Sequence, residues 1–482
     1  MQRLMPEVSG VFYFSGGGSM ADFENRREKL VHIIEDLLKR KQYAQLRGLL
    51  LPLESADVAQ VMEDVSEEGI PLIFRLLPKE SAAEVFVELS PEHQEELIRS
   101  FSNTELKEVL DELYLDDAVD IVEEMPANVV RRILAHTSPE MRKSINEILK
   151  YPEDSAGSLM TTEFIDLKGD MTVEDCFKRI RRNAAEVETI NVCFVLDLDR
   201  KLKGYVTIRD LMMAAYEDLV TDIMDTSVVS VTTLEDQESV AQKFSKYDFL
   251  IMPVVDTENR LVGIITVDDV MDVMQAEATE DIEKMAAILP TDKPYLRTGV
   301  FETWKSRIPW LLLLMISGTF TSLIITRFEN ALMACAVLSA FIPVLTDTGG
   351  NAGSQASVAV IRSLSLKEVH FSDIATVLWK EIRVAVICGL TLAAANFGKL
   401  LLVDGMLFHN AAVTPLVALV VCIALACTVV TAKTVGCTLP LLADKVGLDP
   451  AVVASPFITT IVDVLALLIY FGFATLLIPG VG

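Results

Sequence analysis

The sequence of 482 residues lacks the common signatures of enzymes and of nucleic-acid-binding proteins. None of the motifs HExxH, GxSxG and GxxxxGK[ST] occurs, so metalloprotease, hydrolase and P-loop functions have no support, and we expect no enzymatic activity. Basic residues are also few. The 42 Lys and Arg stand against 69 Asp and Glu, which gives a net charge of −27. Since nucleic acid requires a basic surface, we expect no nucleic-acid partner.

Histidine and cysteine are scarce and scattered. The five histidines form no motif, and none of the seven cysteines lies in a CxxC pair. We expect reduced, buried cysteines in place of disulfides or a zinc site. The first twenty residues lack the long apolar core of a signal peptide, and we expect residues 1–21 to form a disordered leader.

The acidic charge lies in one part of the chain. Residues 301–482 hold ten basic and ten acidic residues, whereas residues 1–300 hold 32 basic and 59 acidic ones. An acidic surface of this kind suits cations as partners. The alternative, that acidity merely keeps a cytoplasmic domain soluble, is equally compatible with composition.

Residues 22–150 predict an acidic, all-α N-domain. Apolar residues recur at three- and four-residue spacing in successive short segments, and each segment begins near a capping residue or a proline. Because helices this short cannot bury an apolar face alone, we expect them to stack into a small superhelix.

Residues 151–275 contain an internal repeat, with copies at about 158–218 and 219–275. Each copy predicts the order strand, helix, strand, turn, strand, helix. The repeat resembles a tandem pair of CBS domains, which are α/β regulatory modules. The pattern Gly-x-x-Thr-x-x-Asp occurs in both copies, as Gly204, Thr207 and Asp210 and as Gly263, Thr266 and Asp269.

A helical connector over 276–307 and a transmembrane domain over 308–482 are expected next. Five apolar spans are each near the length of about 20 residues that a bilayer crossing needs; they lie at about 308–326, 331–361, 377–402, 411–432 and 450–478. With the N-terminus in the cytoplasm, eight basic residues fall inside and two fall outside, as the positive-inside rule requires. We therefore expect a multi-pass protein of the cell membrane whose C-terminus lies outside.

Asp463 is the only formal charge between Pro450 and the C-terminus. A carboxylate at the centre of a membrane helix costs about 2.5–3.5 kcal/mol on insertion scales, so it marks an ion path by default. Ser455, Thr459 and Asp463 repeat every four residues and form one polar stripe. The alternative is an ion pair with Lys399 or Lys433.

The second span carries the stretch PVLTDTGGNAGSQ, residues 343–355. Its glycines let helices approach closely or unwind. Asn351 and Gln355 share one helical face, and Asp347 lies one turn before Asn351. These side chains and the stripe on the fifth span offer only oxygen ligands, which suit Mg²⁺ or Ca²⁺. A tight helix–helix seam explains the same residues without a ligand.

These parts, in this order, together with PVLxxTGGNxGxQ and DPA…P…TT..D, resemble the MgtE family of magnesium channels over about residues 22–482. The resemblance implies a homodimer whose pore is lined by the second and fifth spans, with Asp463 as the selectivity aspartate beside Thr459 and Asn351. It also implies that cytosolic Mg²⁺, bound between acidic domains, closes the connector ("plug") helices. Ala466 and Ser455 depart from the family, which often has Gly and sometimes Asn at these positions.

The resemblance further implies a set of cytosolic sensor ligands in the N-domain, the second CBS copy and the connector. Each of them could instead be an ordinary solvated carboxylate. The candidates are Glu84, Asp116, Asp120, Asp236, Glu238, Asp248, Asp269, Asp272, Glu277, Glu280 and Asp281.

Two alternative functions stay open. The cargo could be Co²⁺, Ni²⁺ or Mn²⁺. The chain could also be a membrane-tethered adenine-nucleotide sensor that transports nothing, with ATP as a regulatory ligand, because Asp can bind ribose hydroxyls and Thr can bind phosphate. The residues for such a site are Thr207, Asp210, Thr266 and Asp269.

Overall fold

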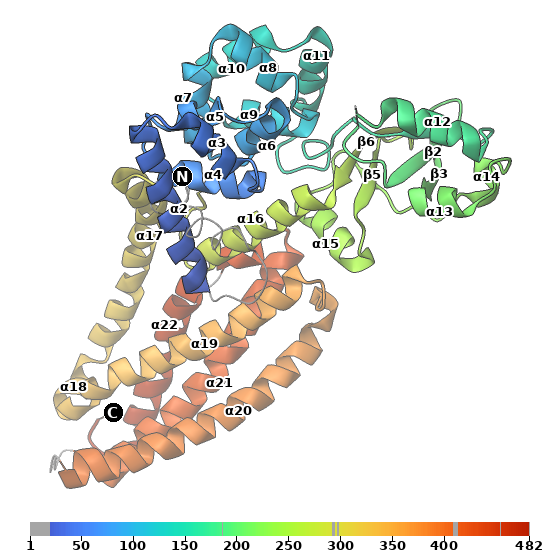
Figure 1. Cartoon of the computed structure of the whole chain (residues 1–482). Helices are drawn as coiled ribbons and strands as arrows, with labels where there is room; N and C mark the ends of the chain where they lie inside the picture. Colours follow the sequence, from blue (N-terminus) through green and yellow to red (C-terminus); the bar gives the residue numbers. More distant parts are fainter. Residues whose placement is uncertain are drawn as a thin grey trace. The chain divides into compact units, whose positions relative to one another are not determined.

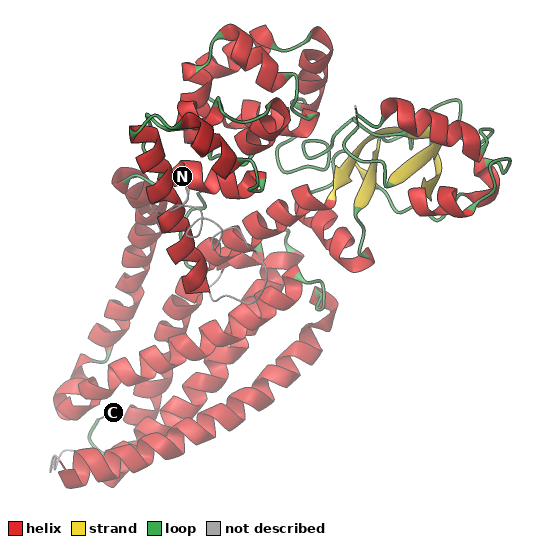
Figure 2. Ribbon diagram, viewed as in Figure 1, coloured by secondary structure: helices red, strands yellow, loops and turns green. Residues whose placement is uncertain are grey.

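The computed structural model describes residues 20–185, 187–291, 295, 298–407, 413–453 and 455–481. Most of these residues are helical, and the strands form two small sheets (Figure 2). The chain divides into two compact units, with the division inside one helix between Met271 and Asp272. Of the expected leader, residues 1–19 lie outside the described residues.

Short helices form the first part of the first unit, as the sequence predicted. Serine caps begin several of them. Ser102 forms a capping box with Glu105, and Ser138 accepts a bond from the Met141 amide. Their apolar faces share one core. The helices are α2 (Met20–Lys39), α3 (Tyr43–Leu50), α4 (Ser55–Asp64), α5 (Ile70–Phe74), α6 (Lys79–Val87), α7 (Pro91–Ser100), α8 (Asn103–Leu110), α9 (Leu115–Glu124), α10 (Ala127–His136) and α11 (Pro139–Ile148).

Two sheets of three strands follow in the same unit. In each sheet the first strand pairs parallel with the second, and the second pairs antiparallel with the third. The repeated order confirms the predicted duplication. The elements are β1 (Asp166–Lys168), α12 (Val173–Asn183), β2 (Val192–Leu196), β3 (Leu202–Thr207), α13 (Ile208–Met213), α14 (Val220–Ile223), β4 (Val231–Thr232), α15 (Gln237–Tyr247), β5 (Ile251–Val255), β6 (Leu261–Thr266) and α16 (Val267–Met285).

The two copies also bond to each other through their backbones. The Leu202 amide donates to the Asn259 carbonyl at 3.0 Å, and the Leu261 amide donates to the Arg200 carbonyl at 3.1 Å. In both copies the glycine of the motif allows a close contact with a backbone carbonyl. A Cβ at Gly204 would lie 2.6 Å from the Asp225 carbonyl oxygen, and one at Gly263 would lie 2.7 Å from the Thr161 carbonyl oxygen.

Long helices make up the second unit, where α19, α20, α21 and α22 run side by side (Figure 1). Among the described residues, four segments are long and apolar enough to cross a membrane: 300–327, 371–403, 415–445 and 450–477. The elements are α17 (Val300–Arg327), α18 (Glu329–Ala334), η1 (Ala336–Phe341), α19 (Ile342–Ser365), η2 (Phe371–Asp373), α20 (Ile374–Lys399), η3 (Leu400–Leu407), α21 (Pro415–Lys445), η4 (Pro450–Val453) and α22 (Ser455–Leu477).

The second expected span, 331–361, differs from the prediction. It is not one helix, because α18 and η1 occupy 329–341 before α19 begins at Ile342. α19 has 24 residues but is not among the four most apolar segments, since its middle is the polar stretch identified in the sequence. That α19 crosses the membrane therefore stays a prediction.

Two further boundaries differ from the expectation. α16 begins at Val267 and ends at Met285, and α17 begins only at Val300, so the expected connector 276–307 is not a single helix. α21 continues to Lys445, 13 residues past the expected end, and Lys433 is a buried residue inside it. The start of the expected fourth span, 411–412, lies outside the described residues.

Candidate metal site

Glycines bring α19 into direct contact with α21 and α22. A Cβ at Gly349 would lie 2.8 Å from Thr428 on α21, and one at Gly350 would lie 2.9 Å from Thr459 on α22. The closest approach is between Gly353 and Gly436, where an added Cβ at Gly436 would lie 2.2 Å from the Gly353 carbonyl oxygen. Of the two possibilities left open for this stretch, the structure has close packing, because α19 is helical throughout.

The departure at position 466 fits this packing. Ala466 is fully buried on α22, and an added Cβ at Gly349 would stand 4.0 Å from its methyl group. The glycine on α19 therefore leaves room for the methyl group on α22. The side chain of Ser455, the other departure, lies outside the described residues.

Asp463 is half-buried on α22, and its Oδ1 atom is a buried acceptor that receives no hydrogen bond from the described residues. Within the part of the chain that the structure describes, no Lys or Arg nitrogen lies within 4.0 Å of its carboxylate, so the alternative pairing with Lys399 or Lys433 is absent there. Thr459 lies one turn earlier on the same helix and is half-buried against Gly350.

A second carboxylate joins this site from α19. Asp347 is exposed and interacts electrostatically with Asp463, and its Oδ1 atom accepts a bond from Asn351 Nδ2 at 3.3 Å. That bond uses the amide nitrogen of Asn351 and leaves its carbonyl oxygen available as a ligand. Sequence reasoning placed Asp347 near Asn351 but left it out of the site. The i, i+4 spacing of Asp347 and Asn351 was the available signal.

A larger group of carboxylates lies in the first unit, around the start of α9. Asp116 is only 8% exposed, and burial, followed by the charge of Asp268, raises its pKa. Burial and the neighbouring Asp116 raise the pKa of Asp117 to about 8. Burial and Asp116 likewise raise the pKa of Asp269, at the start of α16, to about 7. Asp120 is exposed on α9, within electrostatic range of Asp269.

Two glutamates complete this group, which we call the α9 cluster: Asp116, Asp117, Asp120, Glu163, Glu188, Asp268 and Asp269. Glu163 accepts a bond from the Leu115 amide at 3.4 Å, and burial raises its pKa to about 7. Burial and Asp116 raise the pKa of Glu188 to about 8, and its Oε2 atom finds no hydrogen-bond partner in the described part of the chain. Sequence reasoning missed both glutamates, because Glu163 lies in an ordinary loop before β1 and Glu188 in an ordinary loop before β2.

The three candidates around α15 have local structural roles. Asp236 caps the start of this helix by accepting a bond from the Glu238 amide at 3.0 Å, and Glu238 accepts one from Gln242. Asp248 follows the other end with a left-handed backbone. An 11-residue helix is about 16 Å long, so Asp236 and Asp248 of one chain cannot share an ion.

The candidates on α16 divide into exposed and bonded residues. Asp272 is exposed and Glu277 is half-buried. Lys284 bonds Glu280 at 2.6 Å and Asp449, just before η4, at 2.7 Å. Asp281 accepts a bond at 3.3 Å from the Ser365 hydroxyl at the end of α19.

Glu84 stands apart from the other candidates. It is exposed on α6 and accepts a bond from the Ser55 hydroxyl at 2.6 Å. No group of three or more His, Cys, Asp or Glu positioned to hold a metal ion is found in the described ranges.

The two Thr-x-x-Asp motifs form helix caps. Thr207 and Asp210 make a reciprocal capping box at the start of α13, with a hydroxyl–carboxylate distance of 2.5 Å. Thr266 and Asp269 are joined by the same 2.5 Å bond at the start of α16. The motif therefore has a local structural explanation in each copy.

Comparisons with known proteins agree with this arrangement. Residues 342–473 match the family model of a divalent cation transporter, residues 53–154 match the MgtE intracellular N domain, and residues 156–217 and 220–276 match the CBS domain. The class that the fold and the family models define is thus a membrane transporter of divalent cations with a tandem pair of CBS domains.

The relatives identify the family. The magnesium transporter MgtE of Thermus thermophilus is 39% identical, with 94% of this chain and 100% of that protein covered. The magnesium transporter MgtE of Bacillus subtilis is 31% identical, with 93% and 97% covered. The chain belongs to the MgtE family. A solved cytosolic domain of the Mg²⁺ channel MgtE in complex with ATP is 38% identical, covers 50% of this chain and 99% of its own, and has a TM-score of 0.48.

Proposed function

We propose that this chain conducts Mg²⁺ across the cell membrane into the cytoplasm. The observation that carries the proposal is Asp463, a half-buried carboxylate on an apolar helix with one oxygen that accepts no hydrogen bond from the described residues. Placing such a carboxylate in a membrane costs free energy unless a cation binds to it. Family membership supports Mg²⁺ as the cargo, because both MgtE relatives above are named magnesium transporters.

The ligand chemistry favours Mg²⁺ over softer metals. Asp463, Asp347, Asn351 and Thr459 supply only carboxylate, amide and hydroxyl oxygens. Mg²⁺ prefers oxygen and sheds its water reluctantly, so one or two carboxylates binding through the hydration shell suffice. Co²⁺, Ni²⁺ and Mn²⁺ remain competitors for an oxygen site, and a flux assay with mixed metals separates them.

We further propose that the chain works as a homodimer. One chain places two carboxylates, Asp347 and Asp463, near each other, and Asp347 and Asn351 face outward on α19. A second copy about a twofold axis would present the same groups to a shared path and double the carboxylates around one ion. Disulfide formation between copies carrying Asn351→Cys tests this arrangement.

The α9 cluster supports regulation by cytosolic Mg²⁺. Carboxylates crowded between α9, α16 and the loops before β1 and β2 repel one another unless protons or cations neutralise them. Divalent cations would therefore favour the contact of α9 with α16 and with these two loops, and would shift the channel toward one state. The N-terminal domains then lie in the cytoplasm. The proposal of ATP as a second regulator is argued from the two Thr-x-x-Asp motifs and the CBS match.

The decisive test is Mg²⁺ uptake into vesicles that contain the purified full chain. Asp463→Ala should abolish uptake while the protein stays folded. Asp444→Asn, a change at an exposed carboxylate at the end of α21, is the matched control and should keep wild-type flux. Uptake by Asp463→Ala at the wild-type rate would show that Asp463 is not part of the Mg²⁺ path. Uptake absent even in the wild-type protein, with nucleotide binding intact, would favour the sensor alternative.

A further inference from the structure

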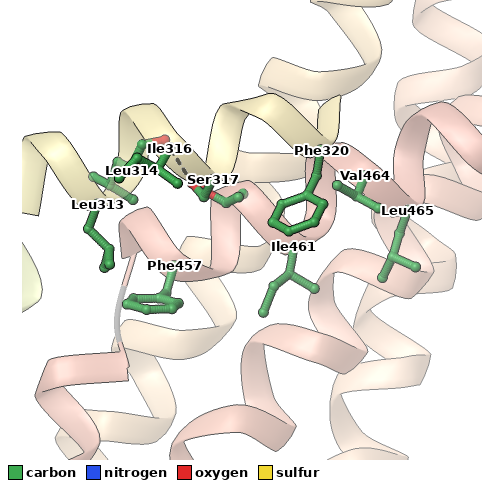
Figure 3. A pocket seen from close by; sticks show the side chains of 10 residues that line it. Leu313, Leu314, Ile316, Ser317, Phe320, Phe457, Ile461, Val464 and Leu465 are labelled. Carbon is green, nitrogen blue, oxygen red and sulfur yellow. Dashed lines mark hydrogen bonds between the residues drawn. The ribbon is translucent and has the colours of Figure 1, made fainter. Parts of the chain in front are cut away.

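An apolar pocket of about 440 Å³ lies between α17 and α22. Leu313, Ser317 and Phe320 line it from α17, and Phe457, Ile461 and Val464 line it from α22 (Figure 3). It lies in the second unit and contains no charged side chain. The pocket is about three times the size of an engineered 150 Å³ cavity that stays dry and binds benzene, so an apolar ligand fits it.

The surroundings of the pocket identify the ligand. Both walls belong to helices that are apolar enough to cross a membrane, and no residue of α17 is buried by the rest of the described chain. Leu313 and Phe320 are 44% and 60% exposed. The pocket thus opens onto the face that meets bilayer lipid, where hydrocarbon chains are the most abundant apolar groups.

Charge near the start of α17 favours an anionic lipid. Lys305 and Arg307 are exposed there, six to eight residues before Leu313, and at 1.5 Å per residue they lie about 9–12 Å along the helix from the pocket. Trp304 is exposed at the same end, and Trp310 packs edge-on against Phe457 with ring centroids 6.0 Å apart. Basic residues beside tryptophans are typical of the headgroup level of a membrane.

We infer that this pocket binds one acyl chain of an anionic phospholipid whose headgroup lies at Lys305 and Arg307. The bound chain occupies the space between α17 and α22, where the hydroxyls of Ser317 and Thr460 lie 3.3 Å apart and bond to each other. Thr460 and Val464 are the neighbours in sequence of Thr459 and Asp463. The lipid therefore packs against the back of the helix that carries the carboxylate stripe, and binding does not depend on which ion is transported.

Quenching of tryptophan fluorescence by brominated lipids tests the site in vesicles that contain the full chain. Of the three tryptophans, Trp304→Phe and Trp379→Phe leave Trp310 as the single reporter at the mouth of the pocket. Brominated phosphatidylglycerol should quench Trp310 at a several-fold lower mole fraction than brominated phosphatidylcholine. Since a basic residue near an anionic headgroup contributes about 1 kcal/mol, Arg307→Gln should lower that preference about fivefold.

Matched variants separate this site from general attraction to the membrane. Arg327→Gln removes one charge at the other end of α17 and should leave the lipid preference unchanged. Val464→Phe fills the pocket from α22 and Ser317→Leu fills it from α17; either one should reduce quenching by both lipids.

Three results would overturn the inference. The first is equal quenching by the two lipids in the parent protein. The second is an equal effect of Arg307→Gln and Arg327→Gln. The third is a disulfide between two copies carrying Phe320→Cys together with no quenching, because a second copy of the chain would then fill the pocket.

Discussion

The α19–α22 site and the α9 cluster both gather carboxylates, but the two regions hold them in opposite ways. In the α19–α22 site two carboxylates, Asp347 and Asp463, lie near each other on helices that glycines hold in close contact. The α9 cluster crowds seven carboxylates together, and burial with mutual repulsion raises the pKa of Asp117 and Glu188 to about 8.

Under the proposed function, this difference corresponds to a division between cation passage at the α19–α22 site and cation detection at the α9 cluster. A site with few charges binds a cation weakly enough to release it, which conduction requires. A crowded cluster gains more from each neutralising cation, because binding relieves repulsion among several groups at once. Close helix packing positions the α19–α22 site. The conformation of the α9 cluster depends instead on whether protons or cations neutralise its carboxylates.

The largest effect should come from the packing of α19 against α21. In Gly436→Ala the new methyl group would meet the Gly353 carbonyl oxygen, and overpacking of this kind typically costs about 1–3 kcal/mol or more. Thermal unfolding of the detergent-solubilised chain measures the loss. Gly472→Ala is the control, because nothing lies within 4 Å of its added Cβ. Similar melting temperatures for the two variants would show that the glycine contact does not position α19.

Next in size is the loss of one carboxylate of the α19–α22 site. Asp347→Asn leaves the bond between positions 347 and 351 possible but removes one charge beside Asp463, and we expect Mg²⁺ uptake to fall about tenfold, equivalent to about 1.4 kcal/mol. Asp117→Asn, in the α9 cluster, should keep the maximal flux and change only its dependence on cytosolic Mg²⁺. If the two variants had the same effect on maximal flux, the division between passage and detection would fail.

The α9 cluster should respond to pH. Its carboxylates Asp117, Glu163, Glu188 and Asp269 have higher pKa values in the folded than in the unfolded chain. The folded contact therefore binds more protons and loses stability as pH rises through the folded pKa values of about 7 to 8. Without divalent cations, hydrogen exchange at α9 should be slower near pH 6 than near pH 8.5. After allowance for solvent screening, the difference should be about 1–2 kcal/mol.

Cations and charge removal sharpen the same measurement. Millimolar Mg²⁺ should restore protection of α9 near pH 8.5. Asp117→Asn with Glu188→Gln should make the pH profile nearly flat. Equal exchange rates at both pH values in the unmodified chain would contradict the view that repulsion limits this contact.

The smallest effect should come from Lys284. Lys284→Gln removes a half-buried ion pair with Asp449 and Glu280 that fastens the end of α16 within the second unit, and we expect a loss of about 1 kcal/mol, seen as faster hydrogen exchange in residues 280–285. Lys143→Gln breaks an exposed 3.8 Å pair with Glu147 and should change almost nothing. Unchanged exchange in Lys284→Gln would place the attachment elsewhere, for example in the contact of Met285 with Ile361 and Ala451.

Periodicity in the sequence was enough for most of the architecture. The short helices, the duplicated α/β pair and the apolar helices follow from local patterns, and Asp463 was identified because a lone charge in apolar sequence is conspicuous. The break before α19 was missed because 329–341 is apolar enough to read as membrane helix. Glu163 and Glu188 could not be found, since only the fold brings these loop residues to α9.

The exchange of backbone bonds between the two α/β copies has a consequence for how this part of the chain can be cut or copied. The amides of Leu202 and Leu261 each donate a hydrogen bond to a turn of the other copy, so each copy covers part of the other copy's sheet edge. A single copy expressed alone would leave that amide at the sheet edge without its partner carbonyl. We expect such a fragment to self-associate through this exposed edge. Each copy thus covers an edge of the other, and we expect the pair to be the smallest fragment of this region that stays soluble.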